Sequence, residues 1–283
     1  MNRKVIADLI DDVRPLWHYV GVWILNAAST ALVDAVAMFK SLLRGDAEQK
    51  LVSVVRFVLS TIRFQIQFIL STIAVLLNAL ASLINNLFSL VKERKLSREE
   101  VEYLLPVFGN AVDYSAVRIQ TGGVKEFLGI SPQAVGNDVF LRRHWGGLQF
   151  DENQLLTKAG YRVLGHELAH VWQYQTSGAG YIGDALLTQF FGVFIKRFNW
   201  QFSDGYNVET ALKRAIHFNA CNVEQQAVLA ELIALAHQTE EPFCLAAFNR
   251  VSGFQLSHAE FEHVLNAHRE LHNGELRACL QTI

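Results

Sequence analysis

Two histidines and a glutamate stand close together in His166-Glu167-Leu168-Ala169-His170. Residues four apart on a helix project from the same face, so both imidazoles can reach one metal ion. Catalytic zinc sites hold Zn2+ with three protein ligands and keep a fourth position open. Glu167 would lie beside that position and could accept a proton from a water molecule there. The spacing therefore predicts a zinc hydrolase with His166 and His170 as metal ligands and Glu167 as the general base.

A third zinc ligand must come from elsewhere in the chain. Metzincins would have a glycine and a third histidine where this chain has Gln173 and Thr176, so that class is excluded. A glutamate on a second helix is the other common solution, and Glu224 and Glu231 lie seven residues apart on one helical face. Helical spacing alone does not choose between them. Glu224 is favoured because small Ala227 follows one turn later, which would let its helix approach the histidine helix closely.

Other side chains are candidates for supporting roles. Zinc hydrolases often use a tyrosine or a histidine to stabilise the oxyanion that forms when water attacks a carbonyl. Tyr206 and His217 lie in the segment before Glu224 and are candidates for this role. Gln173 and Tyr174 are predicted instead to orient the helix that carries the two histidines.

Two helices are predicted in the region that carries these residues. A helix over residues 154–176 would hold the histidines, and Gly178 is placed to end it. Further upstream, Ser97 and Glu100 have the spacing of a capping box that opens a short helix. Pro106 is expected to stop that helix.

Short strands are predicted between these helices. Residues 116–120 and 138–141 are apolar enough to form strands, and glycine-containing turn signals separate them. After residue 176 the pattern is mostly helical to the end of the chain. The sequence therefore predicts an α+β fold, mainly α, with a compact metallopeptidase domain over residues 96–283.

Two long stretches near the N-terminus carry no charged residue. They are residues 15–33 and 64–91, and neither Gly nor Pro interrupts residues 46–95. Apolar residues recur there in steps of three and four, opposite a stripe of Ser, Asn, Gln and Arg. One helix of about 70 Å is predicted, at about 1.5 Å per residue, with Asp46 as its N-cap and Gln49 in its first turn.

Three interpretations fit this long helix. It could pack in a bundle or a coiled coil, which includes pairing with a second copy of the chain. It could insert in a membrane, because residues 64–91 exceed the about 20 that a span needs. It could also be a buried part of one globular core. Residues 1–95 are thus predicted as a hydrophobic or amphipathic helical region that could contact a membrane, a chaperone or a secretion system.

Composition excludes some functions and indicates a compartment. The net charge of −2 at pH 7 gives no basis for binding nucleic acid. The three cysteines are widely spaced, so no disulfide framework is expected, and folding in a reducing cytoplasm fits. Asp8, Asp11 and Asp12 interrupt any apolar run near the N-terminus, so we expect synthesis without a cleaved signal peptide. Export would then need a dedicated secretion system.

Several segments taken together resemble a bacterial zincin-like metallopeptidase domain, over about residues 96–235. Domains of this kind occur in Vgr-related proteins and in others linked to type VI or contractile injection systems. The resemblance implies a gluzincin-like core, with His166, His170 and Glu224 as zinc ligands and Glu167 as the general base. The segments that carry it are 96–99, 108–114, 117–119, 163–175, 180–182 and 222–227.

The predicted function is hydrolysis of peptide bonds in a peptide or protein substrate. The resemblance adds that the chain could be an effector or toxin of a bacterial injection system. The alternative is a membrane-inserting or injection-associated effector whose zinc domain is structural or a non-catalytic scaffold. An intact Glu167 favours the enzyme, because a scaffold has no need of a general base.

Overall fold

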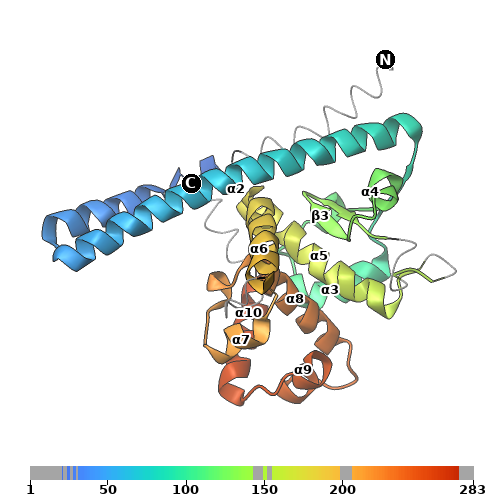
Figure 1. Ribbon diagram of the computed structural model, residues 1–283. Coiled ribbons are helices and arrows are strands. Elements are labelled where there is room, and N and C mark those ends of the chain that lie inside the picture. The colour runs from blue at the N-terminus through green and yellow to red at the C-terminus, as the bar shows by residue number, and fades with distance from the viewer. Residues whose placement is uncertain are drawn as a thin grey trace.

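The computed structural model describes residues 31–142, 149–151, 155–197 and 206–273, together with residues 21, 24, 25, 28 and 29. Helices dominate this part of the chain, and four short strands form one mixed sheet (Figure 1). The α+β fold, mainly α, that the sequence predicts is confirmed.

The longest element is helix α2, Ala47–Phe88, which has 42 residues and is therefore about 63 Å long. Asp46 caps its first turn as predicted, because the Asp46 Oδ1 atom accepts a hydrogen bond from the Gln49 N–H at 2.8 Å. Helical residues 31–44 precede α2, and the chain reverses its direction at the Gly45–Asp46 turn between them (Figure 1).

The prediction that this helix continues to residue 95 is wrong. Ser89 ends α2 in the left-handed conformation, with φ 51°. The charged residues that follow form strand β1, Val91–Lys95, which pairs antiparallel with β2, Arg118–Gly122. The strand pairing gives Glu93 a hydrogen bond from Gln120 directly opposite, at 3.1 Å, which a helical continuation would not provide. The last five residues of the N-terminal region therefore take part in the sheet.

The sheet has the strand order β1-β2-β4-β3. Strands β2 and β4, Asp138–Phe140, run parallel at its centre, and β3, Gln133–Val135, pairs antiparallel with β4 at one edge. Short helix α4, Gly123–Phe127, leads out of β2. The two predicted strands are confirmed as β2 and β4 to within two residues, whereas the sequence did not indicate β1 or β3.

Helix α3, Arg98–Phe108, begins at the predicted capping box of Ser97 and Glu100. The prediction that Pro106 stops this helix is wrong, because Pro106 lies inside it. Pro106 lacks the N–H that would bond the carbonyl four residues earlier, so the helix loses that hydrogen bond. The helix continues nevertheless, and the Gly109 N–H closes its last turn on the Leu105 carbonyl at 2.8 Å. Gly109, with φ 48°, then ends the helix.

Helices from the second half of the chain enclose the core. Helix α5 contacts β3 and β4 as well as α8, and α8 also contacts α3, α9 and α10. Fully buried side chains such as Phe108, Leu164 and Ile233 meet between these elements. The remaining elements are α5 Lys158–Ser177, α6 Gly180–Arg197, α7 Val208–Lys213, η2 Phe218–Ala220, α8 Val223–His237, α9 Leu245–Ser252 and α10 His258–Asn273, with η1 Tyr114–Ala116 earlier in the chain.

The C-terminal half of α2 packs against the domain, across α6 and α4 (Figure 1). Its two buried residues are Ser71 and Asn85. The Gly183 N–H donates to Ser71 Oγ at 2.9 Å, and the Val124 N–H donates to Asn85 Oδ1 at 2.9 Å. This half of the long helix therefore behaves as part of the globular domain.

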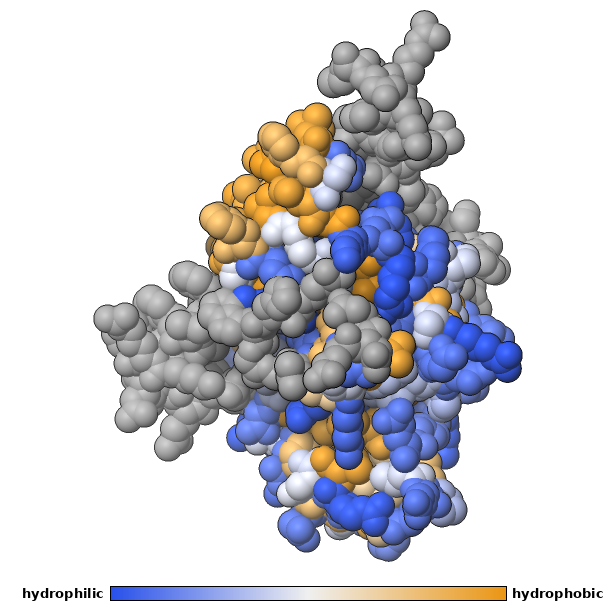
Figure 2. Space-filling model, turned by 90° about the vertical axis from the view of Figure 1, so that its right-hand side faces the viewer, coloured by the Kyte–Doolittle hydropathy of each residue, from blue (hydrophilic) through white to orange (hydrophobic). Residues whose placement is uncertain are grey.

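The N-terminal half of α2 projects away from the domain, and most of its large apolar side chains are exposed. Figure 2 faces the other end of α2 and shows a hydrophobic area in the upper part of that side, above a lower part that mixes hydrophilic and hydrophobic surface. By length and composition alone, α2 could cross a membrane. Self-association and membrane contact therefore stay predictions for the projecting half of α2.

Candidate metal centre

Helix α5 carries the two predicted histidines on one face. Leu164 and Leu168 are fully buried in the core, and these contacts set the rotation of the helix about its axis. His166 and His170 consequently turn toward α8. Gly178, with φ 80°, ends α5 as predicted.

Helix α8 carries Glu224 in its first turn. Asn222 is the N-cap and forms a capping box with Gln225, which fixes where the helix starts. The free N–H groups of a first turn favour a carboxylate nearby. Buried Ala227 of α8 and Gly165 of α5 are small, so the two helices can approach closely. A Cβ added at Gly165 would touch α8.

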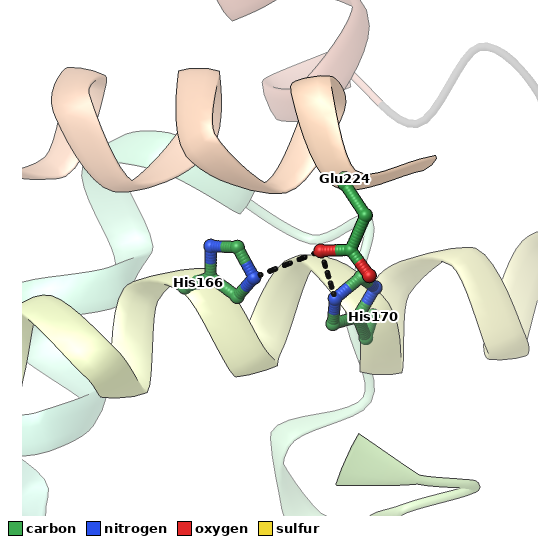
Figure 3. A group of neighbouring side chains, drawn as sticks. All are labelled: His166, His170 and Glu224. Carbon is green, nitrogen blue, oxygen red and sulfur yellow. Dashed lines mark ion pairs between the residues drawn. The ribbon is translucent and has the colours of Figure 1, made fainter. Parts of the chain in front are cut away.

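The structure brings His166, His170 and Glu224 together (Figure 3). Glu224 Oε2 lies 3.4 Å from His166 Nε2 and 3.5 Å from His170 Nε2, and the three potential ligand atoms are all within 4.8 Å of one another. Ligands of tetrahedral zinc at their usual bond lengths are about 3.3–3.4 Å apart. The donor set and the two distances to Glu224 therefore fit a zinc ion held by these three residues.

Gln173 fixes the orientation of His170. Its Nε2 atom donates hydrogen bonds to the Val223 carbonyl at 3.0 Å and to Gln226 Oε1 at 2.9 Å. The Gln173 Oε1 atom is then left to accept from His170 Nδ1, at 2.8 Å. With the proton on Nδ1, the lone pair of His170 Nε2 points toward Glu224, as a metal ligand requires. The predicted orienting role of Gln173 thus has a geometric basis.

Glu231 lies on the far side of His166 from Glu224. Its Oε2 atom is 3.4 Å from His166 Nδ1, and its Oε1 atom pairs with Arg162. A carboxylate at Nδ1 holds the ring in place and leaves Nε2 free to bind a metal. The structure therefore places Glu231 behind the first histidine and Glu224 between the two histidines.

The centre is rich in negative charge. Burial lowers the pKa of His166, but contacts with the carboxylates of Glu224 and Glu231 outweigh burial and raise that pKa to about 10. Burial raises the pKa of Glu224, yet His166 and His170 outweigh it and hold that pKa well below its ordinary value. Carboxylates that stay ionised inside a protein attract a cation, and a divalent metal ion supplies the charge most compactly.

Glu167 is buried beside the ligand cluster, and its Oε2 atom has no hydrogen-bond partner among the described residues. Burial raises its pKa, while the charges of His166 and His170 and a backbone hydrogen bond from Ala134 of β3 lower it. A buried carboxylate oxygen without a donor needs one, and a water molecule at the metal would provide it. This position agrees with the predicted general base.

Lys125 of α4 also lies at this site, and nothing in the sequence singled it out. It is buried, and its Nζ atom has no hydrogen-bond partner among the described residues but lies 5.7 Å from the centre of the Phe140 ring. Burial lowers its pKa, and the charges of Asp138 and Glu167 act in the opposite direction. Lys125 can therefore partly balance the negative charge of Glu167.

Of the two candidates for oxyanion stabilisation, the structure brings only Tyr206 to the centre. The Tyr206 ring stacks on His166, with centroids 6.4 Å apart and planes at 25°. His217 is exposed and lies next to His263 of α10, with centroids 6.2 Å apart, away from the ligand cluster. Position along the chain before Glu224 does not distinguish these two residues.

Tyr181 is a further residue of the centre, and the sequence pattern assigned it no individual role. Its ring stacks on His170, with centroids 5.7 Å apart, and its hydroxyl donates to the Ala134 carbonyl at 2.9 Å. Tyr181 thereby ties α6, α5 and the edge strand β3 together. The signal was present only as part of a segment that resembles the zincin-like domain.

A cavity of about 760 Å³ opens beside the ligand cluster. His166, Glu167, His170 and Glu224 line it together with Tyr206, the edge strand β3, and helices α2, α4 and α6. The volume lies within the about 300–1,000 Å³ that is usual for sites that bind small ligands or substrate groups. The three candidate ligands are therefore accessible from a cavity of the size that small ligands or peptide side chains occupy.

Residues 98–178 match the family model of the eCIS core domain, a domain of extracellular contractile injection systems. No curated protein and no solved structure matches the chain. The matched range includes His166, Glu167 and His170, whereas Glu224 lies outside it. The match supports an association with an injection system, as the resemblance implied. Metallopeptidase activity stays a prediction.

Proposed function

We propose that this chain is a zinc-dependent metallopeptidase that acts in association with a contractile injection system. The observation that carries the proposal is the convergence of His166, His170 and Glu224 at the spacing of zinc ligands, with the unpartnered carboxylate oxygen of Glu167 beside them. The eCIS core match supports the association.

Each residue has a separable part in this chemistry. A zinc ion held by the three ligands would polarise a peptide carbonyl and lower the pKa of water toward about 7. Glu167 accepts a proton from the attacking water and returns it to the leaving amine. Gln173 and Glu231 hold the two imidazoles with Nε2 toward the cluster. The Tyr206 ring stacks on His166, and its hydroxyl would donate a hydrogen bond to the developing oxyanion.

The position of β3 favours a peptide as substrate. Gln133–Val135 lies at the edge of the sheet and along the cavity that reaches the ligand cluster. Extended peptides are commonly bound beside such an edge strand. A substrate chain in this cavity would therefore pass close to Glu167.

Zinc analysis combined with a cleavage assay tests the proposal. The purified, zinc-supplemented chain should hold one zinc ion and cleave members of a mixed peptide library, as detected by mass spectrometry. The Glu167→Gln variant keeps the shape of the side chain but cannot accept the proton. It should keep its zinc and lose at least about 100-fold in rate. A zinc-free wild-type protein, or full activity in the variant, contradicts the proposal.

A second candidate function is favoured by the exposed apolar half of α2. On this alternative the chain is an injection-associated effector that contacts a membrane through its N-terminal helices, and zinc has only a structural role. The alternative predicts zinc in the wild-type protein with no peptide cleavage, so the same experiment separates it from the enzyme.

A further inference from the structure

The cavity beside the ligand cluster is lined mainly by apolar side chains. The ligand cluster and Glu167 are among its polar residues. The other walls come from three separate helices, α2, α4 and α6. The apolar side chains that matter below are Leu77, Ala81, Ile84, Leu128, Ile182 and Leu186.

Helix α2 is held in place on both sides of this cavity. Ser71 anchors it to α6 and Asn85 anchors it to α4, and both are buried hydrogen-bond partners of backbone N–H groups. Arg63 and Gln67 add contacts to Asp184 of α6 beyond the first anchor. The stretch between the two anchors, residues 74–84, is the stretch that lines the cavity. The long helix is therefore a fixed wall and not a loosely attached appendage at this point.

The walls leave large apolar groups in contact with water. Leu77 of α2 is 61% exposed and Leu128, directly after α4, is 62% exposed, although both line the same cavity. When an apolar group covers apolar surface of this kind, the free energy of the system falls. The ligand that fits is one that offers an uncharged, bulky side chain beside the group that reaches the ligand cluster.

We propose that this cavity is the subsite for a large aliphatic or aromatic side chain adjacent to the scissile peptide bond, and that α2 supplies one wall of it. The inference rests on the proposed zinc peptidase function and names its substrate class. It also makes the N-terminal helix, which lies outside the matched domain, a determinant of specificity.

Binding of small zinc-chelating probes to the full-length, zinc-loaded chain tests the inference without requiring turnover. The probes are N-acetyl-leucine hydroxamate and N-acetyl-glycine hydroxamate, which share the chelating group and differ only in the side chain. Calorimetry should give an affinity about 10- to 100-fold higher for the leucine probe, the range expected for burying such a side chain.

A matched pair of substitutions on α2 assigns the wall. Leu77 lines the cavity, whereas neighbouring Leu76 does not, and the two are almost equally exposed at 61% and 63%. Leu77→Asp should abolish most of the preference for the leucine probe, and Leu76→Asp should retain it. Ala81→Trp, which fills the cavity, should act as Leu77→Asp does. Each variant is compared at a zinc content equal to that of the wild type.

The outcomes separate the two proposals. A wild-type chain without zinc, or one that binds neither hydroxamate, overturns the peptidase proposal and the subsite with it. Zinc with equal affinity for the two probes overturns the subsite alone. A preference that Leu76→Asp removes as fully as Leu77→Asp, or that Ala81→Trp leaves intact, overturns the role of α2.

Discussion

His166 lies between two carboxylates that have different tasks. Glu224 faces the Nε2 atoms of both histidines, whereas Glu231 reaches only the Nδ1 atom of His166. Zinc bound by this chain should be lost in Glu224→Ala. In Glu231→Ala it should be retained with about 10- to 100-fold weaker affinity, because an orienting partner is removed and not a ligand. Elemental analysis and competition with a chelator measure both. The reverse order would exchange the two assignments.

The difference between these glutamates shows where prediction from the sequence stops at the residue scale. The H-E-x-x-H spacing and the helical spacing of Glu224 and Glu231 are local patterns, so the histidines, Glu167 and the helix of Glu224 were all predictable. Glu224 and Glu231 share a helical face, and only the crossing of α5 and α8 in space sets which one reaches between the imidazoles. The same holds for Tyr206 and His217, which lie on the same stretch of sequence, although Tyr206 packs on His166 and His217 on His263 of α10.

His237 gives a prediction about pH. Its ring stacks on Phe243 of the loop before α9 and lies 4.9 Å from His268 of α10, and its Nε2 atom is buried without a partner among the described residues. Burial, with the charge that His268 and His272 can carry, lowers the pKa of His237 from 6.5 to about 4. Between these values the unfolded chain binds a proton that the folded chain does not. Stability is therefore full above about pH 6.5 and falls as the pH drops toward 4.

The variant His237→Phe should flatten this dependence, because it removes the titrating group and keeps a ring against Phe243. Urea unfolding at several pH values measures the effect as the slope of the free energy of unfolding against pH. Parallel curves for the wild type and the variant between pH 6.5 and 4 would exclude His237 as a source of acid sensitivity.

At the scale of elements, the crossing of α2 over α6 depends on a glycine. A Cβ added at Gly183 would lie 2.6 Å from the Gln67 carbonyl oxygen and 2.8 Å from Ser71 Oγ. Both distances are shorter than non-bonded carbon and oxygen atoms tolerate. Gly183→Ala should therefore destabilise the chain by about 1–3 kcal/mol, as overpacking does, and expose α2 to proteolysis.

Gly165→Ala is the control for this substitution. Gly165 is also inside a helix, but its added Cβ would lie at ordinary contact distances, with Ala234 Cβ at 3.6 Å. Alanine favours a helix over glycine by about 1 kcal/mol, so this variant should be as stable as the wild type or more stable. Equal free energies of unfolding in the two variants would show that α2 does not pack closely on α6.

The elements that the sequence predicts well are those with signals at their own ends. Asp46, Ser97 and Gly178 mark helix boundaries, and each acts there. The end of α2 was not predictable in this way, because residues 92–95 are good helix formers that become β1 only through pairing with β2. Docking of α2 on the domain was likewise hidden, since a polar stripe does not reveal which of its residues will be buried.

At the scale of the whole molecule, the projecting half of α2 carries more exposed apolar surface than an isolated soluble chain usually does. Leu51 and Leu59 are exposed there, as are several of their neighbours. The wild-type chain should therefore self-associate as its concentration rises or bind lipid vesicles. Leu51→Glu with Leu59→Glu should reduce whichever occurs, while the same charges at Ser53 and Ser60 on the polar stripe should not.

Sedimentation equilibrium and vesicle flotation of the full-length chain distinguish the two forms of association. A dimer or larger oligomer in buffer supports pairing of the long helices, and flotation with vesicles supports membrane contact. A wild-type chain that stays monomeric at its highest soluble concentration and does not float would contradict the prediction.

The candidate metal ligands on α5 and α8 lie far apart in sequence, which has a consequence for the timing of synthesis. A ribosome that has completed α5 has made two of the three donors and Glu167, yet Glu224 does not exist until α8 is translated. The growing chain, or a fragment cut at Gly178, therefore holds no complete centre. If the chain is a hydrolase, that capacity would appear only after α8 has emerged and folded against α5, and the cell that makes the chain would meet it only at a late stage of synthesis.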